Sequence, residues 1–98
     1  MIVVTRSSSG ITIEGHAGYA PRGQDIVCAG ISTLVQTLVQ SFEDLCTDEI
    51  TYHLKPGWAQ IRYGNLSAKA EVLINSFWIG VDMIANRYPD HVTVVRVP

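Results

Sequence analysis

The chain is predicted to fold as an α+β domain in which two helices pack on one face of a sheet of about five strands. Short β-branched or alternating runs predict the strands, and two stretches of helical period predict the helices. Two amphipathic helices need one shared apolar surface, and a sheet supplies it. The expected order of elements is ββαββαβ, and the sheet is expected to be mixed or antiparallel.

Two hairpins account for four of the expected strands. In the first, Ile2–Thr5 is short and β-branched, Ile11–Glu14 alternates apolar with polar residues, and a turn of serine and glycine joins them. In the second, the alternating runs Glu49–Lys55 and Trp58–Tyr63 are joined by a Pro-Gly dipeptide, which favours a tight turn. His91–Val97 is β-branched and predicts a closing strand.

The first helix is expected to begin after Asp25, a good N-cap residue at the end of the loop Ala17–Gln24. Apolar residues then recur at steps of three and four, namely Val27, Ile31, Leu34, Val35, Leu38, Phe42 and Leu45. With Asp25 as the cap, Cys28 is the third residue of the helix.

The second helix has Asn65 and Ser67 as N-cap candidates and ends at Pro89. Its apolar stripe consists of Ile74, Phe77, Trp78, Val81, Ile84 and Ala85. Both stripes are expected to face the sheet. We assign the aromatic residues, Trp58 among them, to the core or an interface rather than to ligand stacking.

The composition predicts one soluble domain, residues 1–98. With 47% hydrophobic and 16% charged residues, the chain is too apolar for disorder and too often interrupted by polar residues for a membrane span. A net charge of -2 with seven scattered basic residues argues against direct nucleic-acid binding. The first residues lack the apolar core and cleavage site of a signal peptide, which predicts a cytoplasmic protein.

His16 and Cys28 are the candidate catalytic residues. His16 follows a strand end, and Cys28 lies in a first helical turn, where the helix dipole and a nearby imidazolium favour a thiolate. His16 would activate Cys28 as a base and protonate a leaving amine as an acid. The free N–H groups of the first turn are candidates for an oxyanion hole. The alternative is that Cys28 is a small core residue.

Other residues near this pair have two interpretations each. An N-cap role explains Asp25 fully, and a catalytic role is the alternative. Ser32 lies one turn beyond Cys28, so its hydroxyl bonds either to the site or to the backbone carbonyl four residues earlier. The loop glycines Gly15, Gly18 and Gly23 are expected to give mobility and to bind substrate or an oxyanion.

The remaining cysteine and histidines are not expected to take part in chemistry. Cys46 is assigned to packing, and about 27 Å would separate it from Cys28 on one helix, which excludes a disulfide. His53 and His91 are expected in strands, at the surface or half-buried. No pair has metal-ligand spacing, so neither a metal nor a cofactor is expected.

The stretch GHAGYAPRGQDIVCAGIS resembles the ribosomal-processing cysteine proteases, the Prp family of bacteria, which has relatives in phages. The shared pattern is GHAG, a short loop, and then GxDxVCAxxS. In this chain it consists of Gly15-His16-Ala17-Gly18, Gly23, Asp25, Val27, Cys28, Ala29 and Ser32. Gly30 stands where the family often has alanine, a departure expected to loosen the first turn of the helix by up to ~1 kcal/mol.

The resemblance implies a homodimer with a His16–Cys28 dyad supported by Asp25 and Ser32. It also implies an endopeptidase that removes a short, apolar, aromatic-containing N-terminal extension from large-subunit ribosomal protein twenty-seven, or one that processes a phage capsid or scaffold protein, through an acyl-enzyme. The alternatives are a non-catalytic ribosome-associated or assembly module with a peptide-binding groove, and a thiol-dependent acyl transferase or deacylase.

Overall fold

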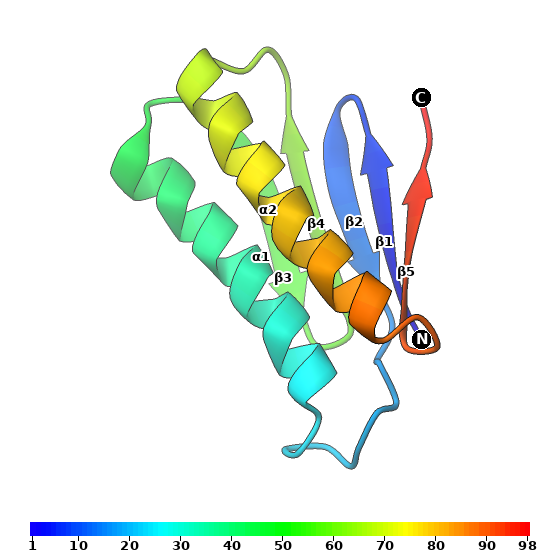
Figure 1. Cartoon of the computed structure of the whole chain (residues 1–98). Helices are drawn as coiled ribbons and strands as arrows, with labels where there is room; N and C mark the ends of the chain where they lie inside the picture. The colour runs from blue at the N-terminus through cyan, green and yellow to red at the C-terminus, as the bar shows by residue number, and fades with distance from the viewer.

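Two layers, a five-stranded sheet and two helices on one of its faces, make up the computed structural model, which describes all residues 1–98 (Figure 1). The strands are β1 (Ile2–Ser7), β2 (Gly10–Glu14), β3 (Ile50–Lys55), β4 (Trp58–Tyr63) and β5 (Val92–Arg96), and the helices are α1 (Ile26–Leu45) and α2 (Ala68–Arg87). The predicted α+β class and the order ββαββαβ are confirmed.

The strand order in the sheet is β3-β4-β2-β1-β5. The β1–β2, β2–β4 and β3–β4 pairs are antiparallel, and β5 pairs in parallel with β1. Because α2 carries the chain back to the end of the sheet where β1 begins, β5 runs beside β1 in the same direction (Figure 1). The sheet is therefore mixed, a choice that the sequence left open.

One hydrophobic core lies between the sheet and the helices. Alternate residues of four strands contribute Ile2, Val4, Ile11, Ile13, Ala59, Ile61 and Val92. The helices contribute Val27, Ile31, Val35, Leu38, Val39, Phe42, Ala70, Ile74, Phe77, Trp78 and Val81. Of the residues predicted to line the core side of α1, Leu34 is half-buried and Leu45 is exposed, because Leu45 is the last residue of the helix. Of the aromatic residues, Phe77 and Trp78 are in the core and Trp58 is half-buried.

Helix α1 is long and apolar enough to cross a membrane by length and composition alone. Core helices of soluble proteins pass the same test. Here the buried side chains of α1 belong to the same core cluster as those of the sheet and of α2. This packing favours a core helix.

Two glycines lie where α1 and α2 approach each other closely. A methyl group on Gly80 would lie 2.6 Å from Leu34 Cδ2, and one on Gly30 would lie 3.0 Å from Ile84 Cδ1. Both distances are shorter than ordinary van der Waals contact. The glycine at position 30 was expected only to loosen the helix, and the structure shows that it also makes room for α2.

Both helices begin at a side-chain cap that the sequence indicated. Asp25 caps α1, and Ser67, rather than Asn65, caps α2 by accepting a hydrogen bond from Ala70 N at 3.2 Å. Ser67 in turn donates from its N and its Oγ to the carboxylate of Asp48, at 2.7 and 2.6 Å. Both bonds lower the pKa of Asp48, and the bond from Ser67 Oγ lowers it more than the bond from Ser67 N. The segment before β3 is thereby attached to the start of α2.

The loop between β2 and α1, the start of α1, the β3–β4 turn and the end of α2 gather at one end of the molecule, the lower end in Figure 1. The predicted site residues lie at this end.

Candidate active site

His16 and Cys28 line the same two cavities at this end of the fold. The apolar cavity, of about 530 Å³, lies between α1 and the β3–β4 hairpin and is bounded by side chains such as Ile31, Val35 and Leu54. The loop cavity, of about 670 Å³, lies along the β2–α1 loop. The fold therefore brings a histidine from a strand end and a cysteine from a helix start to one place.

The imidazole of His16 lies against the β3–β4 turn. Gly57, in this turn, has a φ of +73°, and a methyl group added to it would lie 2.8 Å from His16 Nε2. The N–H of Gly15 donates to the carbonyl oxygen of Gly57 at 2.9 Å, which attaches the end of β2 to the same turn. The position of His16 thus depends on a turn about forty residues further along the chain.

Cys28 is half-buried, and its sulfur accepts a hydrogen bond from the backbone N–H of Ala17 at 3.2 Å. The N–H groups of Val27 and Cys28 both donate to Asp25 Oδ1, at 3.0 Å. These two N–H groups of the first turn are therefore not free for an oxyanion hole, because the N-cap uses them. The N–H that reaches the sulfur comes from the loop instead.

The carboxylate of Asp25 joins the helix to the loop. Its Oδ1 caps α1, and its Oδ2 accepts a hydrogen bond from Tyr19 N at 3.0 Å. The hydrogen bond from Cys28 N, helped by the one from Tyr19 N, lowers the pKa of this carboxyl although desolvation opposes the shift. Both oxygens are occupied by backbone donors, which favours the structural interpretation of Asp25 over the catalytic one.

Ser32 is exposed and lines both cavities together with Cys28. The local bond to a carbonyl four residues earlier is made by its neighbour, since Thr33 Oγ1 donates to Ala29 O at 2.8 Å. Ser32 thus borders the site, and neither of the two bonds expected of its hydroxyl is found. A supporting role for Ser32 remains a prediction.

The three loop glycines all adopt left-handed backbone conformations. Their φ values are +94° at Gly15, +67° at Gly18 and +88° at Gly23. Gly15 lines the apolar cavity, and the other two line the loop cavity. The glycines therefore set the path of the backbone around the cavities, and their predicted part in binding stays untested.

His91 is the residue near the site that the sequence did not indicate. It was expected in the last strand, but it precedes β5, and its Nδ1 lies 2.9 Å from the carbonyl oxygen of Ala17. The two residues are 74 positions apart, so no local pattern connects them.

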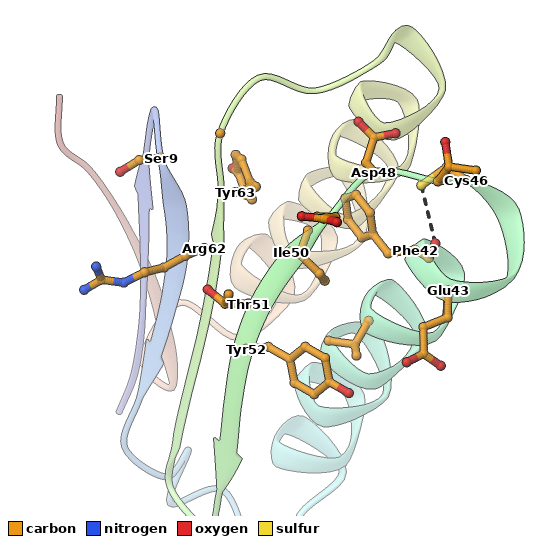
Figure 2. Close-up of a pocket in the computed structure, with 14 residues that line it drawn as sticks. Ser9, Phe42, Glu43, Cys46, Asp48, Ile50, Thr51, Tyr52, Arg62 and Tyr63 are labelled. Carbon is orange, nitrogen blue, oxygen red and sulfur yellow. Dashed lines mark hydrogen bonds between the residues drawn. The ribbon is translucent and has the colours of Figure 1, made fainter.

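A separate cavity of about 680 Å³ lies at the other end of α1 and contains neither His16 nor Cys28 (Figure 2). Figure 2 shows Ile50 of β3 beside Phe42 of α1, Tyr52 pointing from β3 toward α1, and Arg62 pointing away. Cys46 lies at its rim, where its Sγ contacts Phe42 O at 3.5 Å. Both cysteines are free, and no three His, Cys, Asp or Glu side chains are grouped so as to hold a metal.

Comparison with known proteins decides the family. The family model described as cysteine protease Prp matches residues 1–93. The chain belongs to the Prp family of cysteine proteases. Among curated Prp proteins, that of Mycoplasma genitalium is 30% identical over 94 residues, which cover 96% of this chain and 94% of the relative. The Mycoplasma pneumoniae Prp is 44% identical over 43 residues, 44% of this chain and 43% of the relative.

Solved structures agree with the fold. The Prp of S. aureus, in complex with a covalently linked product peptide, superposes with a TM-score of 0.94 at 21% identity, covering 99% of this chain and 100% of the other. The SMU.848 protein of Streptococcus mutans gives a TM-score of 0.74 at 28% identity, covering 98% and 91%. Membership of the Prp family makes the chain a peptidase of the cysteine type, and the roles of its individual residues are considered next.

Proposed function

We propose that the chain is a cysteine endopeptidase in which Cys28 is the nucleophile and His16 is the general acid and base. One observation carries the proposal: His16 and Cys28, from different elements, open onto the same two cavities. Cys46, the other cysteine, opens onto a cavity that has no histidine in its lining. Cys28 is therefore the cysteine with a candidate base beside it.

Each step of the proposed reaction uses these two side chains. The imidazole takes the thiol proton, and Sγ attacks the scissile carbonyl carbon as the carbonyl π pair moves to oxygen. The tetrahedral intermediate collapses, the C–N bond breaks, and the amine leaves with the proton from His16. Water then attacks the thioester and gives a proton to His16. The C–S bond breaks, the acid is released, and the proton passes from His16 to the sulfur, which restores the thiol.

In the structure Cys28 Sγ is hydrogen-bonded to Ala17 N, and the His16 ring rests on Gly57. Catalytic hydrogen bonds are often long or absent before substrate binds and shorten in the complex. We propose that a bound peptide brings the imidazole and the sulfur together, and that residues 20–24 of the loop, beyond the fixed Ala17 and Tyr19, close over the peptide.

The proposed substrate is the apolar, aromatic-containing N-terminal segment of large-subunit ribosomal protein twenty-seven or, for a phage enzyme, of a capsid or scaffold protein. The apolar cavity supports this choice. Eight of its fifteen lining residues are hydrophobic, and they come from α1, from β1 and β2, and from the β3–β4 hairpin. Such a surface favours apolar side chains of an extended peptide.

The experiment compares Cys28→Ala with Cys46→Ala. The N-terminal segment of the ribosomal protein is incubated with each variant, and the products are identified by mass. A single internal cut is expected with the unaltered chain and with Cys46→Ala, and none with Cys28→Ala. Turnover by Cys28→Ala contradicts the assignment of the nucleophile, and the absence of any cut by the unaltered chain favours a peptide-binding module.

Two further parts of the proposal concern the setting. We propose that the enzyme acts in the cytoplasm, where its two free cysteines stay reduced.

We also propose a homodimer. The exposed side chains Val72, Ile79 and Met83 lie on one side of α2 and offer an apolar surface for association. Light scattering of the protein as it elutes from a size-exclusion column measures its mass in solution. A monomer mass at micromolar concentration would count against the homodimer.

A further inference from the structure

We propose that His91 is a positioning residue that holds the backbone N–H of Ala17 against the sulfur of Cys28. The inference deepens the proposed function, on which its catalytic consequence rests. It assigns a role to a histidine far from the GHAG and DxVCA stretches in sequence.

Ala17 is fixed through both of its backbone polar groups. Its N–H donates to Cys28 Sγ at 3.2 Å, and its carbonyl oxygen lies 2.9 Å from His91 Nδ1. A carbonyl oxygen can only accept, so Nδ1 of His91 must carry the hydrogen. These two bonds restrict both peptide planes that flank Ala17. The direction of its N–H toward the sulfur therefore depends on His91.

His91 is itself well anchored. Its backbone N donates to Tyr88 O, and its backbone O accepts from Ile2 N, both at 2.9 Å. Its ring meets the ring of Tyr19 edge-to-face, with centroids 5.4 Å apart, and Tyr19 makes a similar contact with Tyr88 at 5.2 Å. The imidazole is thus held between the sheet, the end of α2 and the loop.

The contacts form a closed circuit around the nucleophile. Asp25 accepts from Cys28 N and from Tyr19 N, Tyr19 packs on His91, and His91 bonds to Ala17, whose N–H returns to the sulfur of Cys28. A circuit that closes on itself fixes the sulfur relative to the loop more firmly than any single bond.

This arrangement has a chemical consequence. An N–H directed at the sulfur favours the thiolate, because hydrogen bonds to charged acceptors are about twice as strong as neutral ones. When the C–S bond forms, the negative charge moves to the former carbonyl oxygen, next to the same N–H. Since Asp25 occupies the N–H groups of Val27 and Cys28, Ala17 supplies the remaining donor identified beside the sulfur.

The test measures the alkylation rate of Cys28 by iodoacetamide in the Cys46→Ala background, so that one thiol reacts. His91→Phe keeps a flat ring for Tyr19 but removes the donor, whereas His91→Asn places an amide N–H near the position of Nδ1. We expect His91→Phe to react about two- to tenfold more slowly at neutral pH and His91→Asn to restore the rate. His53→Phe, at an exposed histidine of β3, is the matched control and should react like the parent.

The proposal would be overturned if folded His91→Phe were alkylated at Cys28 as fast as the parent, or if His91→Asn did not restore the rate of alkylation. Amide hydrogen exchange at Ala17 in the unaltered chain tests the contact without a substitution, in case His91→Phe does not fold. Slow exchange is expected, and exchange as fast as in an unprotected loop overturns the inference. Alkylation does not depend on peptide cleavage, so failure of this proposal is distinguishable from failure of the proposed function.

Discussion

Replacement of Gly57 tests how the β3–β4 turn positions His16. A methyl group at this residue would lie 2.8 Å from His16 Nε2, and ordinary contact begins at 3.4 Å, so the ring must retreat by about 0.6 Å. A misplacement of about 1 Å can cost a hundredfold in rate. We therefore expect Gly57→Ala to lower kcat/KM for peptide cleavage by roughly ten- to a hundredfold.

The same change has a separate effect on stability. At a φ of +73° an alanine costs roughly 1–2 kcal/mol, because its Cβ crowds the following carbonyl oxygen. For a domain of this size each kcal/mol lowers the melting temperature by about 4–8 °C. Thermal melting followed by circular dichroism measures this effect independently of the rate.

Two companion variants separate the contact from the backbone strain. Asn tolerates a left-handed φ but carries the same Cβ as alanine. Gly57→Asn should therefore lose less stability than Gly57→Ala, whereas the two variants should lose the same amount of activity. Gly23→Ala, at a φ of +88° with no atom within 4 Å of the added methyl, measures by thermal melting the cost of the backbone conformation without a contact to His16. Full activity in folded Gly57→Ala would refute the argument that this turn positions His16.

The remaining predictions concern two carboxylates, that of Asp25 at the start of α1 and that of Asp48, which accepts hydrogen bonds from Ser67 at the start of α2. Asp25→Ala should lower the melting temperature, whereas Asp25→Asn should keep the cap and most of the peptide cleavage; loss of cleavage in a folded, equally stable Asp25→Asn would favour a catalytic carboxylate. Because the pKa of Asp48 is lowered from 3.8 on folding, its carboxylate stabilises the fold above about pH 4, and this contribution is lost as the pH falls through the lowered value. The melting temperature of Asp48→Asn should thus fall less between pH 7 and pH 3 than that of the unaltered chain, and parallel curves would contradict the role of the Asp48–Ser67 bonds.

The secondary structure was predicted well because its signals are local. The apolar period of residues 27–42, the Pro56-Gly57 turn and the caps Asp25 and Ser67 each act within a few residues of where they stand. The same local rules placed Cys28 as the third residue of α1, as the structure confirms. The direction of β5 was left open, since strand pairing depends on where α2 returns the chain.

The environment of the site was predicted less well because it is built from distant segments. The spacing of His16 and Cys28 indicated a candidate pair, but only the packing of α1 beside the β3–β4 hairpin puts both on one cavity. The donors around the sulfur were misassigned, because a cap that uses two N–H groups and a loop that supplies another cannot be distinguished from sequence spacing.

The sequence by itself determined the order of elements, the start of the first helix and the identity of the candidate nucleophile, since period, capping and turn chemistry operate over a few residues. The tertiary structure decided the rest: the contact of His16 with Gly57, the bond from Ala17 N to Cys28 Sγ and the approach of His91 to the loop. Each of these joins residues brought together by the burial of one shared core. No local preference specifies such contacts.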